Sequence, residues 1–255
     1  MIDMHSHILF GVDDGPATFE ESLSMLEQAA AEGITGIIST SHAKQPQYHV
    51  EPTTVNEQLD LLKMELKMRN ISLSLYEGHE IRLHESLLTG ILQNKLLRLA
   101  GSKYVLLELP SQNVPRYTID IINELLANGI IPVIAHPERN KGIAEKPERL
   151  ARLIRQGAIA QVTAGSISGH FGKGVQRIAL QLIDANLVHA IGSDVHNLNN
   201  RPFLFDKGLT YLEKKGRADY VDLFLENNEN IIVNKDVILL EPETPKKKSW
   251  WVLGV

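Results

Sequence analysis

The sequence predicts an α/β protein built as a (β/α) barrel. Seven short apolar segments rich in Ile, Val and Leu alternate with longer segments of helical periodicity along the 255 residues. The apolar segments lack the alternation of a half-exposed sheet, so they fit strands that are buried on both faces. Seven strand–helix repeats favour parallel strands joined by right-handed crossovers. A closed barrel suits this pattern better than an open sheet, which is the alternative.

The expected strands follow one another along the chain as Ile2–His5, Gly36–Thr40, Ser72–Tyr76, Tyr104–Leu109, Ile131–Ala135, Ile159–Thr163 and Val188–Ile191. The clearest expected helices lie between them, at Thr18–Glu32, Thr54–Arg69, Arg116–Asn128, Pro147–Gln156 and Val175–Asn186. Thr18 and Glu21 have the spacing of a capping box, which starts the first helix. Gly33, Gly129 and Gly157 stand where three of the helices should end.

Residues 1–240 form one expected domain, because they contain neither a linker nor an internal repeat. Composition changes only in a tail at residues 241–255, which contains the basic triplet Lys246–Lys248 and both tryptophans. We expect the tail to pack on the barrel or on a neighbouring subunit, with contact to an anionic membrane as the alternative. No apolar run approaches ~18 residues and no signal-peptide pattern opens the chain, so a cytoplasmic location is expected.

The composition excludes several kinds of chemistry. The chain contains no cysteine, which excludes disulfides, thiolate metal sites and every mechanism with a cysteine nucleophile. Its formal net charge is −5, and this acidic balance argues against a nucleic-acid partner.

Side chains that can bind metal ions follow six of the seven expected strands, at the carboxyl end of each: His5, His7, His42, Glu80, Glu108, His136, Asp194 and His196. In parallel barrels the loops at that end converge on one site. Nitrogen and carboxylate ligands without sulfur suit Mn, Fe or Zn. A single histidine of this kind is more often a hydrogen-bonded core residue, but repetition at nearly every strand favours a centre of two or three ions.

Several motifs resemble the PHP (polymerase and histidinol phosphatase) superfamily: His5–Ser6–His7, Asp13–Asp14–Gly15, Thr40–Ser41–His42, Gly78–His79–Glu80, Ala135–His136–Pro137–Glu138–Arg139 and Ser193–Asp194–Val195–His196. Within this superfamily, residues 1–240 are similar to the bacterial metal-dependent tyrosine-protein phosphatases of capsule and exopolysaccharide operons. The resemblance implies a distorted seven-stranded (β/α) barrel of the PHP type. It also implies three divalent ions, with Mn as the first choice and Fe or Zn as alternatives.

The resemblance further implies how the ligands divide among the three ions. The first ion would be held by His5, His7, Glu80 and Asp194. The second would be held by Glu80, Glu108 and His136, with Glu80 as the bridge. The third would be held by Asp14, His42 and His196. Asp13 is a rival to Asp14, because many relatives have a histidine in this loop and one sequence does not fix the register.

The activity that the resemblance implies is hydrolysis of phosphotyrosine on a bacterial tyrosine kinase that regulates capsular or exopolysaccharide synthesis, and on that kinase's protein substrates. A hydroxide bridging two ions would attack the phosphorus in line. Three divalent ions outweigh four carboxylates, which favours a phosphate dianion. Arg139, and second Arg201, would clamp the phosphate, while a surface ion pair is the plainer role for each. Because metal-binding histidines must be neutral, activity should fall toward pH ~6 and be highest at about pH 8 or above.

Other functions remain open at this stage. The first alternative is another PHP phosphoesterase, such as a histidinol-phosphate or nucleotide phosphatase. An exonuclease is disfavoured by the acidic charge. A non-catalytic, metal-stabilised module that binds a kinase is an alternative of a different class, and so is an amidohydrolase-like C–N hydrolase. The sequence leaves the oligomeric state open.

Overall fold

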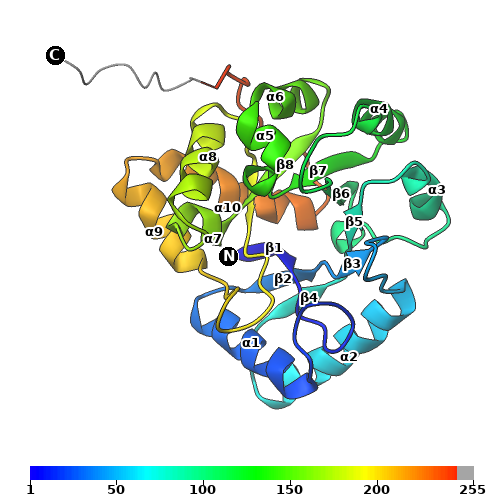
Figure 1. Cartoon of the computed structure of the whole chain (residues 1–255). Coiled ribbons are helices and arrows are strands. Elements are labelled where there is room, and N and C mark those ends of the chain that lie inside the picture. The colour runs from blue at the N-terminus through cyan, green and yellow to red at the C-terminus, as the bar shows by residue number, and fades with distance from the viewer. Residues whose placement is uncertain (246–255) are drawn as a thin grey trace.

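The structure is a computed structural model that describes residues 1–245 (Figure 1). Its strands are β1 (Ile2–Ser6), β2 (Gly36–Ser39), β3 (His42–Ala43), β4 (Ser74–Tyr76), β5 (Glu80–Arg82), β6 (Tyr104–Glu108), β7 (Ile131–Ala135), β8 (Ile159–Thr163) and β9 (Ala190–Gly192). All seven expected strands are present, with ends that differ by no more than two residues. Every pairing between these strands is parallel, as the buried apolar runs predict.

Two of the seven barrel strands are interrupted, which is why the barrel is distorted. The strands pair in the orders β1-β2-β4 and β3-β5-β6-β7-β8-β9, with β3 continuing β2 and β5 continuing β4 along the chain. At the interruption, the Glu80 N–H donates to Thr40 O at 3.0 Å, while the Thr40 N–H donates to Ser6 O at 2.8 Å. The chain therefore steps from pairing with β1 to pairing with β5.

Backbone contacts between the first and last strands close the barrel. Ser6 and Val195 form a parallel bridge. The Asp194 N–H donates to His5 O at 2.8 Å, and the His7 N–H donates to Val195 O at 2.9 Å. The prediction of a distorted seven-stranded (β/α) barrel is thereby confirmed.

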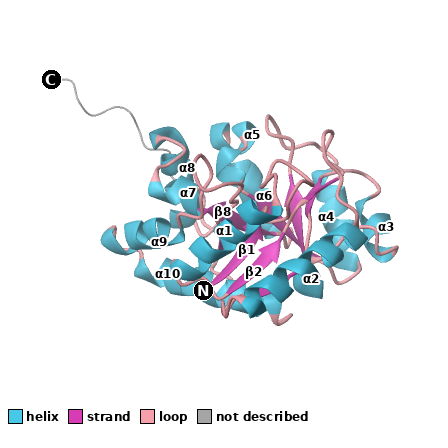
Figure 2. Ribbon diagram, turned by 90° about the horizontal axis from the view of Figure 1, so that it is seen from below, coloured by secondary structure: helices cyan, strands magenta, loops and turns pink. Residues whose placement is uncertain are grey.

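The helices surround the strands and follow the chain once around the barrel (Figures 1 and 2). They are α1 (Phe19–Ala31), α2 (Pro52–Met68), α3 (Leu87–Leu92), α4 (Thr118–Ala127), α5 (Lys141–Glu145), α6 (Glu148–Arg155), α7 (Ala164–Ser168), α8 (Lys173–Asp184), α9 (Phe205–Lys214) and α10 (Ala218–Ile232), with short 3-10 turns η1 (Leu99–Gly101) and η2 (Pro137–Arg139). The expected capping box starts α1, because Thr18 Oγ1 accepts the Glu21 N–H at 3.2 Å and the Glu21 carboxylate accepts the Thr18 N–H at 3.3 Å.

The amino-terminal end of the barrel is filled and covered. Met4, Ile38 and Tyr104 belong to a buried apolar cluster in which α10 takes part through Ile231. From α10, Asn228 Nδ2 donates to Ile2 O at 2.8 Å and to Ile191 O at 2.7 Å, so the helix is bound to the first residue of β1 and to the middle residue of β9. The opposite end, where the strands finish, is left for the functional site.

The first residues of the predicted tail lie against the turn after α8. The Glu243 N–H donates to Ala185 O, and Asn186 Nδ2 donates to Glu241 O, each at 2.9 Å. The basic triplet and the two tryptophans lie outside the described residues. Among residues 1–245, the structure has no helix that is long and apolar enough to cross a membrane.

Candidate metal centre

The nine side chains proposed as metal ligands meet at the carboxyl end of the barrel. Four overlapping groups bring their ligand atoms within 4.8 Å of one another: His7, Asp14, His42 and His196; His5, His7 and Glu80; His5, His136 and Asp194; and His42, Glu80 and Glu108. Asp14 and His136 keep contact with solvent, whereas the other seven side chains are buried. The strand-end pattern in the sequence therefore corresponds to one cluster in space.

The grouping differs in part from the division that the resemblance implied. His7 joins the set of Asp14, His42 and His196, and His42 stands with Glu80 and Glu108. His136 lies in the group of His5 and Asp194, although its Nε2 is also 2.8 Å from Glu80 Oε1. Glu80 takes part in two of the groups, as a bridging carboxylate would.

Buried atoms of this cluster are left without hydrogen bonds, which is the mark of a cation site. His5 Nε2 lies 3.3 Å from Asp194 Oδ1, and His7 Nε2 lies 3.4 Å from Glu80 Oε2. Neither nitrogen makes a hydrogen bond among the described residues, and neither does Asp194 Oδ1. Nitrogen and oxygen lone pairs that face one another around a common space fit divalent ions that prefer such ligands.

Asp13 and Asp14 have different places in the loop after β1. Asp14 Oδ1 lies 3.3 Å from His42 Nε2 and 3.2 Å from His196 Nε2, inside the cluster. Asp13 lies behind it, where its Oδ2 accepts from His7 Nδ1 at 2.9 Å and from the His42 N–H at 3.1 Å. A proton on His7 Nδ1 leaves Nε2 free to bind a metal ion, so Asp13 is placed to orient a candidate ligand.

Two further side chains contact candidate ligands without belonging to the candidate set. Gln161 Oε1 on β8 lies 3.1 Å from His5 Nδ1, while its Nε2 donates to Val162 O at 2.7 Å. That second bond identifies Oε1 as the acceptor, so Nδ1 of His5 carries the proton and Nε2 faces the cluster. Arg82 Nη1 lies 2.9 Å from Glu108 Oε1. Sequence reasoning missed both residues. The only feature that could have indicated them is a polar residue within a strand.

The backbone at the site is held in conformations that non-glycine residues seldom adopt. His136 has φ +32° and Asp194 has φ +55°, both in the left-handed region. Such strain concentrates at functional sites because the surrounding structure enforces it. Gly192, just before this turn, leaves room for His5, since a Cβ there would lie 2.6 Å from His5 Cβ.

The electrostatics of the cluster favour positive charge. Burial alone would raise the pKa of the Glu80 carboxyl, but His5, His136 and His42 hold it well below its usual value. Burial would likewise lower the pKa of His42, yet hydrogen bonds to Asp14 and Glu80 raise it to about 11. Glu108 is the exception, because burial and the Glu80 charge raise its pKa. The carboxylate charges that stabilise the protonated form of His42 would also stabilise divalent cations in the same space.

Two arginines line the mouth of the site. A cavity of about 270 Å³ opens above the cluster and is lined by Arg139 and Arg201 together with six of the nine proposed ligands. Arg139 Nη1 and Arg201 Nη2 both donate to Asp194 Oδ2, the latter at 2.6 Å. Both residues line the cavity, and a guanidinium has further N–H groups that an anion could accept from. The Tyr48 ring stacks on His42, with centroids 5.9 Å apart, so it borders the same region.

Fold and site together define a parallel (β/α) barrel protein whose strand ends carry a centre of histidines and carboxylates suited to divalent metal ions. The chain belongs to the CpsB/CapC family of capsular polysaccharide synthesis, whose pattern it matches over residues 1–233. Among its relatives, the tyrosine-protein phosphatase YwqE of Bacillus subtilis is 38% identical over 249 residues, which cover 98% of each chain. The tyrosine-protein phosphatase CpsB of Streptococcus pneumoniae is 30% identical over 241 residues, covering 92% of this chain and 99% of CpsB.

Solved structures agree with this family. The chain superposes with a TM-score of 0.94 and 38% identity on a structure from work on B. subtilis YwqE and S. pneumoniae CpsB, which are described as unique metal-dependent tyrosine phosphatases. The match covers 97% of this chain and 100% of that one. A histidinol phosphate phosphatase from Lactococcus lactis has a TM-score of 0.55 at 12% identity, a likeness in fold alone.

Proposed function

We propose that this protein is a metal-dependent protein-tyrosine phosphatase, a phosphoric monoester hydrolase that acts on phosphotyrosine. The observation that carries the proposal is the complete set of nine metal-ligating side chains at one end of the barrel, with buried lone pairs left unpaired. Membership in a family of capsular polysaccharide synthesis, with relatives named as tyrosine-protein phosphatases, supports the choice of substrate. The lack of cysteine leaves no phosphocysteine route.

We propose His5, His7, Asp14, His42, Glu80, Glu108, His136, Asp194 and His196 as the ligands of three divalent ions, with Mn first and Fe or Zn as alternatives. Such ions would supply Lewis-acid activation of water and of the phosphoryl oxygens. Asp14 is the ligand and Asp13 the positioning residue, because only Asp14 presents an oxygen to the cluster. Glu80 bridges the groups, and its two oxygens face histidines on different sides.

Arg139 and Arg201 are the proposed phosphate-binding residues. Both donate to Asp194 Oδ2, so this one oxygen is shared between two guanidinium groups. Phosphate oxygens could accept these hydrogen bonds in place of Asp194 Oδ2, which would leave that carboxylate available as a metal ligand. Guanidinium groups then neutralise charge on the equatorial oxygens as the leaving phenolate departs. A phenolate with a pKa near 10 needs little help from a general acid.

The proposed substrate is a tyrosine kinase that regulates capsular or exopolysaccharide synthesis, together with that kinase's protein substrates. We propose that the reaction takes place in the cytoplasm. An open mouth at the carboxyl end of the barrel suits a phosphotyrosine carried on a flexible segment, since the half-exposed arginines stand at its rim.

A comparison of substrates tests this function. Purified protein with added Mn is given a phosphotyrosine peptide and, in parallel, histidinol phosphate. We expect a kcat/KM for the peptide at least about tenfold higher. Preference for histidinol phosphate would reassign the protein to another phosphoesterase, and turnover of neither by folded, metal-loaded protein would favour a binding module.

A further inference from the structure

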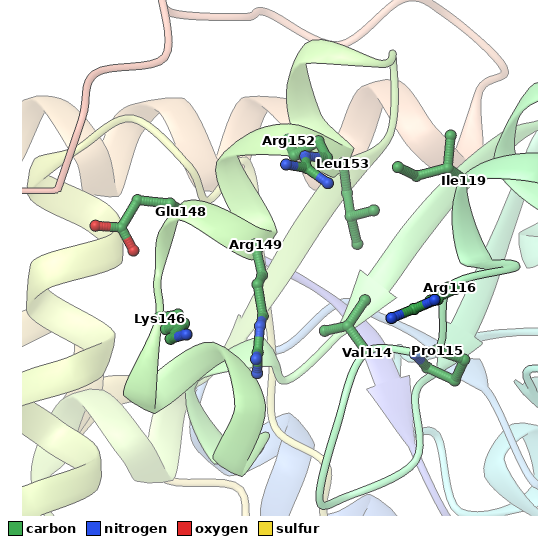
Figure 3. A pocket seen from close by; sticks show the side chains of 9 residues that line it. All are labelled: Val114, Pro115, Arg116, Ile119, Lys146, Glu148, Arg149, Arg152 and Leu153. Carbon is green, nitrogen blue, oxygen red and sulfur yellow. The ribbon is translucent and has the colours of Figure 1, made fainter.

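Beside the metal centre lies a second cavity, of about 540 Å³, that the proposed chemistry does not use (Figure 3). It is formed between the start of α4 and the segment that contains α5 and α6. Its apolar lining includes Val114, Ile119 and the buried Leu153. Four cationic side chains also line it: Arg116, Lys146, Arg149 and Arg152.

These cations are free to bind an anion. No carboxylate lies within ion-pair distance of Arg116, Lys146, Arg149 or Arg152 in the part of the chain that the structure describes. Glu148 is the one acidic residue of the lining, and its carboxylate points away from the three arginines in Figure 3. A patch of this kind stands out on a chain of net charge −5.

Hydrogen bonds between the segments that line the cavity hold its walls in place. Asn140 Nδ2 donates to Pro110 O at 2.7 Å and to Asn113 O at 3.0 Å, joining the loop after β6 to the start of α5. Arg149 Nη1 donates to Gly142 O at 2.9 Å, which holds one guanidinium at the cavity. A Cβ on Gly142 would lie 2.8 Å from that same Nη1 and 3.0 Å from Asn113 Cα, so the approach depends on glycine.

The loop after β6 and the start of α5, which form this wall, also lie between the basic cavity and the metal centre. Ser111 and Asn140 line the catalytic cavity, and Val114 and Lys146 line the basic one. Three peptide bonds connect Ser111 to Val114, so their Cα atoms are at most ~11 Å apart. An extended peptide covers ~3.3–3.6 Å per residue, so one short segment can reach both cavities.

We propose that the basic cavity is a substrate-docking subsite that takes a second anionic side chain from the peptide whose phosphotyrosine is being hydrolysed. The inference rests on the proposed phosphatase function and extends it to substrate selection. The apolar lining takes the stem or ring of that side chain, and the guanidinium groups take its charge. A second phosphotyrosine and a glutamate both have this chemistry. The preferred substrate therefore carries two anionic side chains separated by about three to five residues.

The test uses three peptides with the same target phosphotyrosine. The second position, a few residues away, carries a non-hydrolysable phosphotyrosine mimic, a glutamate or an unmodified tyrosine. Wild-type protein with Mn should have a KM about three- to tenfold lower for one or both anionic peptides than for the tyrosine peptide, given the usual scale of exposed ion pairs. The preference should shrink at high salt. Which anionic peptide is preferred identifies the side chain.

The variant Arg116→Gln/Arg152→Gln should lose this preference while hydrolysing a small aryl phosphate at the wild-type rate. The matched control, Arg155→Gln/Arg177→Gln, removes two exposed arginines that do not line the cavity and should keep the preference. Fluorescence anisotropy with labelled peptides whose target position is also a mimic measures the same binding without turnover.

Equal KM and equal anisotropy for all three peptides would overturn the subsite, even with normal phosphatase activity. If no peptide is hydrolysed, the phosphatase proposal fails, and anisotropy still decides whether the cavity prefers a second anion. Binding of anionic lipid vesicles that is lost in Arg116→Gln/Arg152→Gln, without any peptide preference, would overturn the docking proposal in favour of a membrane contact.

Discussion

Asp13 provides a sharp test of how the proposed metal centre is organised, because it would act through the proposed ligand His7. Its carboxylate accepts three hydrogen bonds, from His7 Nδ1 at 2.9 Å, from the His42 N–H at 3.1 Å and from the Gly15 N–H at 3.0 Å. The pKa of Asp13 is lowered to about 2, since the charge and hydrogen bond of His7 outweigh burial. Asp13 is therefore ionised under all working conditions and keeps the proton of His7 on Nδ1.

The change Asp13→Asn preserves shape but supplies only one accepting oxygen. If that oxygen faces His7 and His42, the new NH₂ group opposes the Gly15 N–H, and the negative charge behind His7 is lost. Asp13→Ala removes all three acceptors. Loss of a carboxylate behind a metal-binding histidine costs 10–100-fold in affinity or activity, so we expect about tenfold for the asparagine and ~100-fold for the alanine variant.

Metal affinity is measured by competition with a chromophoric chelator, and kcat/KM is measured on a small aryl phosphate at saturating Mn. Glu20→Gln, an acid-to-amide change on the exposed face of α1, is the matched control and should change neither value. If Asp13→Ala keeps wild-type metal affinity, then Asp13 does not orient His7 for metal binding.

Three further predictions concern the arginines, pH and the ions. Arg139→Lys should lower kcat/KM on phosphotyrosine peptide by about 10–100-fold with metal affinity unchanged, since lysine cannot form the bidentate pair; an unchanged kcat/KM would remove Arg139 from phosphate binding. Burial lowers the pKa of His189 from 6.5 to about 4. Between pH 6.5 and pH 4 the imidazole is therefore protonated in the unfolded chain but neutral in the folded chain, so the free energy of unfolding falls as the pH falls. His189→Gln should thus reduce, by about 1.6 kcal/mol, the stability lost between pH 6.5 and 5 in urea unfolding of chelator-treated protein, and an identical pH dependence would contradict this. Chelation should lower Tm by roughly 5–10 °C, from the ~2.7 kcal/mol gained at a free metal concentration of 100 Kd, and an unchanged Tm would argue against a centre that binds metal in the folded state only.

The fold was largely predictable because buried parallel strands leave a strong signal. Ile131–Ala135 and Ile159–Thr163 have in the structure the bounds that the sequence suggested. The two-residue strand His42–Ala43 was not expected, since its existence depends on pairing with Glu80 and Ile81. His42 and Glu80 are far apart along the chain, so no local sequence pattern predicts that they pair.

The candidate ligands were predictable for a related reason. Strand ends fix where Glu108 and His136 must lie, and a parallel barrel brings all such ends together. Side chains that support the ligands were harder to find, because Gln161 and Arg82 gain their roles only from contacts made in space. Asp13 and Asp14 stand side by side in sequence, and only the three-dimensional turn decides which one faces the cluster.

The measurement that tests the central claim most directly is hydrolysis of a phosphotyrosine peptide with Mn, with a chelator, and by an Asp194→Asn variant. Asparagine tolerates the left-handed backbone of this position, φ +55°, so the variant should fold, and its melting curve verifies that. The account predicts turnover with Mn, loss of turnover with the chelator, and loss in the folded variant. Turnover that survives both the chelator and Asp194→Asn would contradict a metal-dependent phosphatase at this site.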